Sequence, residues 1–260
     1  MPAEVFADGA GLGDRFVALV GEPESPGWIA AAKLFDTALP AAIAALGSKR
    51  GTDSPAVAGV LLFEQYAQRL AAPVLAALHL HDSVVDARLS AVRTKLSDGG
   101  LRQLAFARPP DPIGTDRETA HARVAEDLVN GNLYPAAAAV HRSSRVGMRV
   151  LHGTVANAIA STFLHMSWPD ANRARYVLDA HAFLDRVPGL AQLVTVDAVD
   201  SGGERWMYTD RNSCCLAFRT TVNQARDQHY CGTCPVLPHE TTRALFGQAT
   251  ASYAERHPRT

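Results

Sequence analysis

The sequence has no long apolar run and no excess of charge of either sign. No stretch approaches the roughly 20 consecutive apolar residues that a membrane-spanning helix needs, so we expect no transmembrane segment. Lysine and arginine total 25 against 26 aspartate and glutamate residues, and this balance gives no indication of a nucleic acid partner. A composition of 47% hydrophobic and 20% charged residues is typical of a globular protein long enough to bury a large core.

Several nucleotide-binding and targeting signals are also missing. The sequence contains neither GxxxxGK[ST] nor a GxGxxG that follows a strand, so no bound nucleoside triphosphate or dinucleotide is predicted. The N-terminal MPAEVFADGAGLGDRF carries acidic residues where a secretory signal carries positive charge. We therefore expect a cytoplasmic protein, and the composition is also compatible with loose attachment to the inner face of a membrane.

Cysteine is absent from the first 213 residues and then occurs four times within 21 positions. The four are Cys214, Cys215, Cys231 and Cys234. Cysteines that serve only as small core residues would be scattered along the chain. In a reducing compartment, clustered thiols more often serve a metal or a redox reaction than a structural disulfide. The cluster is therefore the primary candidate site.

The rest of the sequence predicts an α+β fold in which helices dominate. Apolar residues recur three and four apart from about 26 to 81, and further helical patterns follow over 121–144, 145–166, 170–187 and 241–257. Segment 84–107 alternates around the turn SDGG, which predicts a β-hairpin, and segment 190–210 predicts two strands separated by the turn DSGG. We expect a helix-rich α+β body over 1–200, with a hairpin or small antiparallel sheet, and a C-terminal segment over 201–260 that carries the four cysteines.

The spacing of the cysteines favours a metal group but leaves its identity open. Cys231 and Cys234 form a CxxC, in which two intervening residues let both thiolates turn back onto one group. Cys214 and Cys215 are adjacent, so their side chains point in different directions and suit a polynuclear group better than a single ion. Four thiolates are the usual ligands of iron–sulfur clusters, but they also hold structural zinc. Redox-active thiols remain a third interpretation.

The cysteine motif resembles that of a known family. Arg211-x-x-Cys214-Cys215-x-x-x-Arg219, followed by Cys231-x-x-Cys234-Pro235, is similar to the signature of the FhuF-type ferric siderophore reductases. The resemblance covers roughly the last 50 residues. It implies that Cys214, Cys215, Cys231 and Cys234 ligate one [2Fe–2S] cluster. The 15 residues between Cys215 and Cys231 are more than is usual in the family, which a flexible loop tolerates at little entropic cost.

The resemblance also implies an activity and its partners. The protein would reduce ferric iron bound to hydroxamate-type siderophores, which dock between the helical body and the cluster segment, and would release Fe²⁺ in the cytoplasm. Because no cofactor-binding fingerprint is present, electrons would come from a separate ferredoxin or NAD(P)H-dependent reductase. Arg211 and Arg219 bracket the cysteine pair and would donate hydrogen bonds to sulfur or remain solvated. The alternatives are a non-enzymatic interaction protein with a structural Cys₄ zinc site, and a siderophore-binding or biosynthetic protein.

Other residues receive weaker functional interpretations. His229 lies two residues before Cys231 but is expected to be polar surface rather than a fifth ligand. The histidines of the predicted helices are spaced by nearly whole numbers of helical turns. They could therefore share one face and present polar groups to a siderophore, although ordinary amphipathic surface is the favoured interpretation. They are His141, His152 and His165, with Arg145 and Arg149 nearby. Trp168, Trp206 and Tyr208 are expected to belong to the core.

Overall fold

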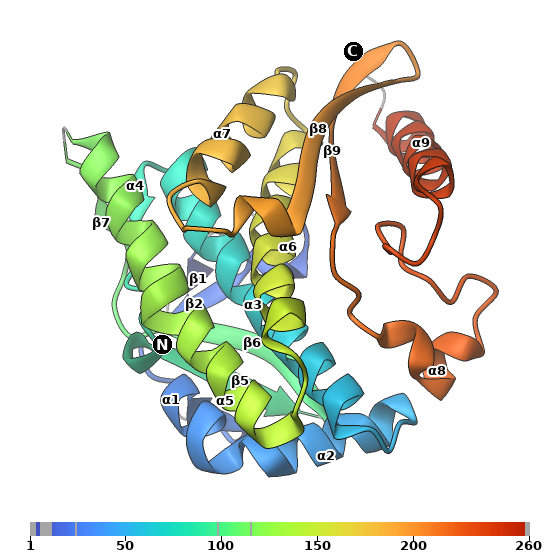
Figure 1. Ribbon diagram of the computed structural model, residues 1–260. Coiled ribbons are helices and arrows are strands. Elements are labelled where there is room, and N and C mark those ends of the chain that lie inside the picture. The colour runs from blue at the N-terminus through green and yellow to red at the C-terminus, as the bar shows by residue number, and fades with distance from the viewer. Residues whose placement is uncertain (1–3, 6–11, 24, 98, 115, 258–260) are drawn as a thin grey trace.

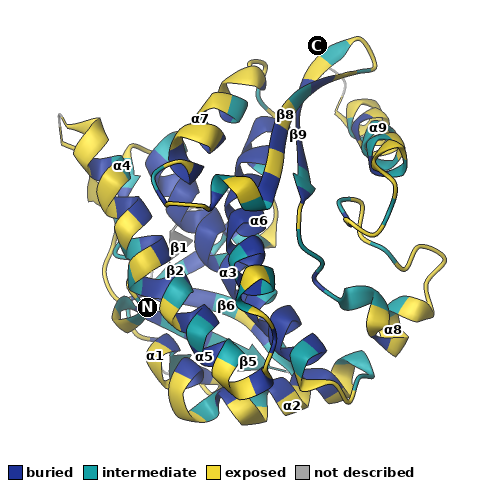
Figure 2. Ribbon diagram, in the orientation of Figure 1, coloured by how far each residue is buried: buried dark blue, intermediate teal, exposed yellow. Residues whose placement is uncertain are grey.

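Two long buried helices form the centre of the fold. The computed structural model describes residues 4–5, 12–23, 25–97, 99–114 and 116–257. Helix α3 (Pro55–Leu80) and helix α6 (Met148–Ser167) lie side by side in the middle of the molecule (Figure 1), and most of their residues are dark blue in Figure 2 because they are buried. Both helices are apolar on nearly every face, which is typical of helices enclosed by other elements.

The start of α3 follows directly from its sequence. Ser54 caps the helix, since its hydroxyl accepts a hydrogen bond from the backbone N–H of Val57 at 3.4 Å. Pro55 occupies the first helical position, where a missing N–H costs nothing. The apolar sequence that follows then fixes α3 at the centre of the core, so any polar side chain on this helix needs a partner or a pocket.

Shorter helices surround this pair. Two of them continue through π-helical turns, η3 (Leu34–Ala38) and η5 (Glu126–Leu133), into the next helix. The surrounding helices are α1 (Ala31–Lys33), α2 (Leu39–Arg50), α4 (Arg117–Ala125), α5 (Tyr134–Ser144) and α7 (Ala174–Leu184). The helix predicted after Pro169 is present as α7, although it begins only at Ala174.

A five-stranded sheet packs against the same core, in the order β1-β2-β6-β5-β3. The pair β5–β6 is the first predicted hairpin, and β2 runs parallel to β6 whereas the other neighbours are antiparallel. The strands are β1 (Glu4–Val5), β2 (Ala18–Val20), β3 (Trp28–Ala30), β5 (Val92–Ser97) and β6 (Gly100–Phe106). The helical prediction from residue 26 onward was wrong at β3, where three residues pair with β5 instead.

The second predicted hairpin is also present and leads to the cysteines. Strands β8 (Val194–Ser201) and β9 (Glu204–Arg211) pair along their whole length and pack on α6 and α7. The C-terminal helix α9 (His239–Arg256) lies beside this hairpin (Figure 1). Trp206 and Tyr208, both buried, form a small aromatic core there with Trp168, Phe246 and Tyr253. Their predicted place in the core is confirmed.

The remaining elements are short, and the fold class is the predicted one. They are β4 (Ser83–Val84), β7 (Asp111–Pro112), α8 (Thr221–Gln224) and the 3₁₀ turns η2 (Asp14–Phe16), η4 (Leu89–Ala91), η6 (Ala191–Leu193) and η7 (Ala217–Arg219). The structure is a helix-rich α+β fold with small antiparallel and mixed sheets. Within its described part, no helix has both the length and the apolar character required to cross a bilayer.

Candidate functional site

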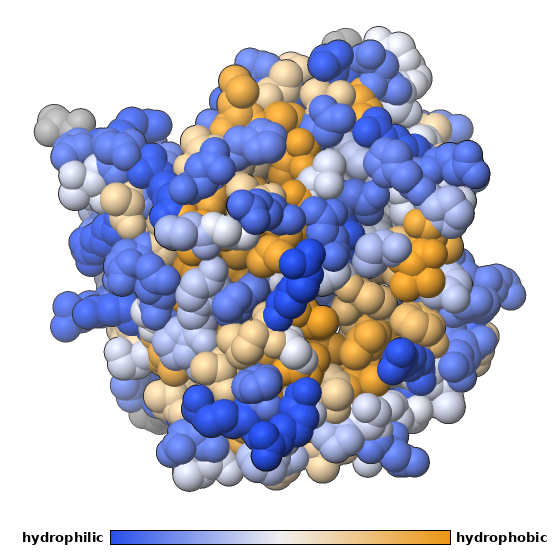
Figure 3. Space-filling model, viewed as in Figure 1, coloured by the Kyte–Doolittle hydropathy of each residue, from blue (hydrophilic) through white to orange (hydrophobic). Residues whose placement is uncertain are grey.

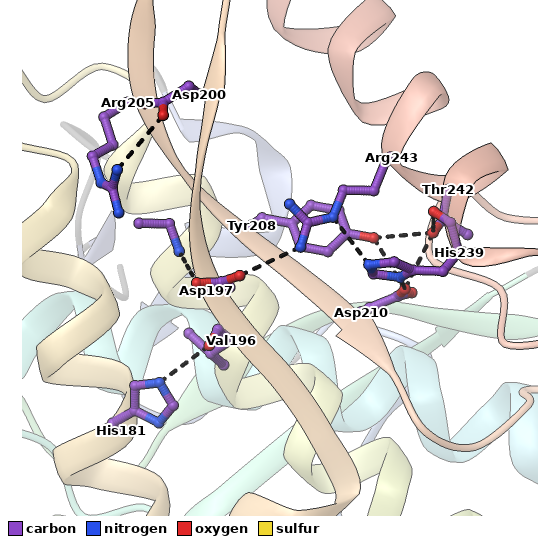
Figure 4. Close-up of polar contacts among 11 residues, drawn as sticks. His181, Val196, Asp197, Asp200, Arg205, Tyr208, Asp210, His239, Thr242 and Arg243 are labelled. Carbon is purple, nitrogen blue, oxygen red and sulfur yellow. Dashed lines mark hydrogen bonds and ion pairs between the residues drawn. The ribbon is translucent and has the colours of Figure 1, made fainter.

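The segment that carries the cysteines is held at both ends by the contact between β9 and α9. Asp210 of β9 accepts hydrogen bonds from Thr242 Oγ1 at 3.2 Å and from His239 Nδ1 at 3.3 Å (Figure 4). The Tyr208 hydroxyl lies 3.0 Å from both the Asp210 carboxylate and Thr242 Oγ1. These bonds fix the start of α9 against the end of β9, so residues 212–238 form a loop with two anchored ends.

Arg243 extends the same network across the hairpin. Its guanidinium lies 4.6 Å from the centre of the Tyr208 ring and donates to Asp197 of β8 at 3.3 Å (Figure 4). Its Nε also donates to His239 Nε2 at 3.1 Å, which leaves the proton of a neutral His239 on the nitrogen that faces Asp210. Each member of the network thus fixes the orientation of the next.

Within the loop, the backbone folds tightly around the cysteine pair and around the CxxC. Leu216 adopts a left-handed conformation with φ of 61°, and its N–H donates to Cys214 Sγ at 3.3 Å. In the CxxC, the N–H of Cys234 donates to the carbonyl of Cys231 at 3.0 Å, which closes the turn. Hydrogen bonds from backbone N–H groups to cysteine sulfur are one of the means by which proteins adjust iron–sulfur centres.

The four cysteines come together as two pairs of free thiols. Cys215 contacts Cys231, and Cys214 contacts Cys234, so each pair joins the adjacent cysteines to the CxxC. Cys215 and Cys234 are buried, Cys214 is half-buried and Cys231 is exposed. Among the described residues, no three His, Cys, Asp or Glu side chains converge on a position for a single metal ion. Four thiols in two pairs are a donor set of the chemistry that both iron–sulfur clusters and structural zinc use.

The two members of one pair differ in acidity. The hydrogen bond to Cys231, together with burial, raises the pKa of the Cys215 thiol, whereas acceptance of that hydrogen bond lowers the pKa of Cys231. Burial also raises the pKa of Cys234.

A buried ion pair joins the cysteine loop to the central helix. Arg211, the last residue of β9, is 4% exposed and pairs with Glu64 of α3, which is 16% exposed. Burial alone would lower the pKa of Arg211, but the charges of Glu64, Cys215 and Cys231 outweigh it and raise that pKa. Arg211 Nε has no hydrogen-bond partner. Glu64 is thus the charge partner of Arg211, and the role of Arg211 toward the sulfurs stays a prediction.

An open cavity of about 390 Å³, the cysteine pocket, lies between this loop and helices α3 and α6. Figure 3 shows apolar side chains beside hydrophilic ones over the segment that runs from β9 to α9. The lining is mostly polar: Arg15, Arg50, Glu64, Gln65, Gln68, Asn157, Ser161, His165, Thr209, Arg211, Asn223, Arg226 and Thr233, with Cys215, Cys231 and three apolar residues. A second cavity of about 410 Å³ between α2 and α3 contains no cysteine.

The other predicted residues are dispersed. Arg219 is exposed, with its guanidinium 5.7 Å from the centre of the Phe218 ring, and its role toward the sulfurs stays a prediction. His229 is exposed and bonds to the carbonyl of Arg226 at 3.3 Å. Of the three helical histidines, His165 lines the cysteine pocket, whereas His152 stacks on Tyr134 of α5. The histidines therefore do not form one stripe toward the cysteines.

Sequence reasoning missed Glu64 and its neighbours on α3. Gln68 Nε2 donates to Glu64 Oε1 at 3.2 Å, and Gln65 accepts from the N–H of Leu101 at 3.0 Å. Arg69, the residue after Gln68, donates to the carbonyl of Arg102 at 3.0 Å. A signal was available: these four polar residues interrupt an otherwise apolar helix, and a polar group on a buried helix needs a partner or a function.

The loop approaches α6 closely at one glycine. A Cβ added at Gly153 would lie 2.8 Å from Ser213 Cβ, one residue before the cysteine pair. We expect Gly153→Ala to reduce the free energy of unfolding by about 1–3 kcal/mol, because overpacking displaces the loop or the helix. In a Ser213→Gly background the same change should become stabilising by about 0.5–1 kcal/mol, since alanine favours a helix over glycine. Urea denaturation of the four variants measures both effects, and equal effects in the two backgrounds would contradict the proposed contact.

A comparison with protein families identifies the chain. A family model described as ferric iron reductase FhuF-like transporter matches residues 60–197. The chain belongs to this family. The FhuF-like match begins in α3 and ends in β8, so it includes Glu64 and His165 but none of the cysteines. The family predicted from the cysteine motif is thus confirmed by a different part of the chain, and membership supports a ferric-iron-reductase-like function. No curated protein matches the chain.

Proposed function

We propose that the protein is a one-electron ferric siderophore reductase whose cofactor is a [2Fe–2S] cluster held by Cys214, Cys215, Cys231 and Cys234. The observation that carries this proposal is the meeting of four free thiols, as two pairs, beside a polar pocket in a chain of the FhuF-like family. The cluster, when bound, supplies a carrier of single electrons. On this proposal residues 201–260 bear the cofactor and residues 1–200 form the body on which the substrate docks.

The substrate chemistry needs no more than one electron. Fe³⁺ is a hard, highly charged ion that siderophore oxygens hold tightly, whereas the same ligands hold Fe²⁺ much less tightly. Reduction therefore releases the metal without cleavage of the siderophore. The residues of the protein then have two tasks: to place the ferric complex next to the exposed Cys231, and to provide a polar environment for the charge that is transferred.

The electron has to come from outside the chain. Because the sequence has no nucleotide-binding fingerprint, we propose that a ferredoxin or an NAD(P)H-dependent reductase is the donor, in the cytoplasm. Hydroxamate-type siderophores are the substrate class that the resemblance implies.

The visible spectrum of the protein purified without oxygen tests the proposal. We expect red-brown absorption that bleaches with dithionite and returns when one equivalent of a ferric siderophore is added, while a ferrous chelator reports one Fe²⁺ per electron. A colourless protein with stoichiometric zinc would replace the reductase by a structural Cys₄ site, since Zn²⁺ has no visible absorption. A bleached spectrum that no ferric siderophore restores would retain the cluster and reject the substrate.

A further inference from the structure

The cysteine pocket carries an excess of positive charge. Its lining includes Arg15, Arg50, Arg211 and Arg226, but Glu64 is the single carboxylate among the described residues that line it. Glu64 is already paired with Arg211. Arg15, Arg50 and Arg226 form no ion pair with any residue in the described part of the chain, and the charge of Glu64 acts on Arg15 as well as on Arg211.

A second basic hollow adjoins the pocket. This basic recess, of about 290 Å³, shares Arg50 and Gln65 with the cysteine pocket. Lys49, Arg69 and Arg102 also line it, and no described carboxylate does. Burial, and then the nearby charges of Arg15 and Arg102, lower the pKa of Arg69, while the charge of Asp14 acts in the opposite direction. The cations of Arg15 and Arg69 repel each other, and an anion bound near them would relieve that repulsion.

Three residues that line the cysteine pocket carry buried polar atoms without a partner. Arg50 Nε, Arg211 Nε and Thr209 Oγ1 are all buried without a hydrogen-bond partner, and all three residues line the cysteine pocket. Thr209 is 1% exposed and Arg211 is 4% exposed. A buried donor without a partner costs free energy, and the side chains that carry these three atoms border one cavity, where a ligand with acceptor oxygens would offer them partners.

The thiol group does not account for all of this charge. Arg211 is the arginine whose charge acts on both Cys215 and Cys231. The basic recess contains no cysteine, yet Lys49 and Arg69 line it beside Arg50 and extend the positive surface. The positive charge thus continues away from the cysteines, where an elongated anionic ligand would lie.

We infer that the cysteine pocket and the basic recess together form a charge-selective site for anionic ferric chelates, whose carboxylate groups contact Arg15, Arg50 and Arg69. Ferric complexes of citrate-based hydroxamates carry such groups, whereas a ferric trihydroxamate complex has no net charge. The inference rests on the proposed function. In the reaction one electron from the external donor converts Fe³⁺ to Fe²⁺, the chelate stays intact, and the complex gains one negative charge, which the arginines stabilise.

Binding of gallium complexes tests the inference apart from reduction, because Ga³⁺ resembles Fe³⁺ in charge and ligand preference but is not reduced. Calorimetry on the full-length protein with its cofactor would compare an anionic citrate-dihydroxamate complex with a neutral cyclic trihydroxamate complex. We expect the anionic complex to bind at least about tenfold more tightly, which corresponds to one charge-assisted contact. Its affinity should fall as salt rises from 0.05 to about 0.5 M, while that of the neutral complex stays constant.

Variants identify the contact. Arg50→Gln should weaken the anionic complex about tenfold and the neutral complex less than about twofold. Arg142→Gln, on the exposed side of α5, is the matched control and should change neither. Equal affinities for the two wild-type complexes, without salt dependence, would overturn the inference. So would equally tight binding of metal-free citrate or inorganic phosphate, because the site would then recognise any small anion.

The outcomes separate the two proposals. If the anionic gallium complex is preferred but neither ferric complex is reduced, the proposed function fails and the binding site stands. If both ferric complexes are reduced with the same kcat/KM and bind equally well, the reductase stands and the charge selectivity fails.

Discussion

Cys215→Ser and Cys234→Ser variants are each expected to contain less than about a tenth of the iron and acid-labile sulfide of the wild-type protein, and to lose ferric reduction to the same extent. Loss of a residue that merely supports a metal ligand already costs about 10- to 100-fold in affinity, so loss of a ligand should cost at least as much. One variant is taken from each thiol pair, so both halves of the site are tested.

His229→Ala is the control for these variants. His229 lies two residues before Cys231, but it is exposed and bonds to the carbonyl of Arg226. We expect this variant to keep its full iron content and activity. Because serine is close to cysteine in size and His229 is exposed, far-UV circular dichroism should be unchanged in all three variants. Wild-type iron content in either cysteine variant would show that its thiol is not a ligand.

The hairpins and the aromatic residues were predictable because their signals are local. The turn sequences SDGG and DSGG lie between alternating segments, and both hairpins form where those turns indicate. Trp206 and Tyr208 lie on the face of β9 that packs against Trp168, Phe246 and Tyr253, and both are buried there as expected. In the hairpins, neighbours in sequence are neighbours in space, so pattern and turn chemistry are sufficient, whereas the two aromatic residues are predictable from their size and apolar character.

The five-stranded sheet was not predictable in the same way. Strands β1 to β3 are two or three residues long, which is too short for an alternating pattern to be recognised. The register of β2 against β6 joins Leu19 to Ala105, a pairing that no local signal specifies. Tertiary contacts therefore override the helical composition of this segment at β3.

The cysteine segment of the candidate site was predictable, but the pocket residues that the helical body contributes were not. The clustering of the thiols indicated the cysteine segment, but the pairs that they form depend on how the 15 residues between Cys215 and Cys231 fold. Glu64, Arg15 and Arg50 reach the pocket from α3, η2 and α2, far away in the sequence. Such a juxtaposition follows from the packing of α3 under the loop, which a single sequence does not specify.

Glu64→Gln is expected to reduce the free energy of unfolding by about 3 kcal/mol, because it leaves the buried guanidinium of Arg211 without a charge partner. Arg211→Met should cost less, since Glu64 is 16% exposed and borders the cysteine pocket, where water can solvate it. The double variant should recover most of the loss, because the removal of both charges leaves no unpaired ion in the core. Chemical denaturation of the four proteins yields the coupling energy, and additive effects would show that the pair is not coupled.

The same cycle separates stability from redox chemistry. Arg211 lies beside Cys215 and Cys231, so its positive charge favours the form of a bound cluster that carries more negative charge. Glu64→Gln removes an opposing negative charge and should raise the midpoint potential, whereas Arg211→Met should lower it. Arg142→Gln is the control, because Arg142 lies on the exposed side of α5 and lines neither the cysteine pocket nor the basic recess. If Glu64→Gln and Arg211→Met shift the potential in opposite directions while both lower the free energy of unfolding, the charges of the pair act on the cysteine site directly. If both variants shift the potential in the same direction, the pair only holds β9 on α3.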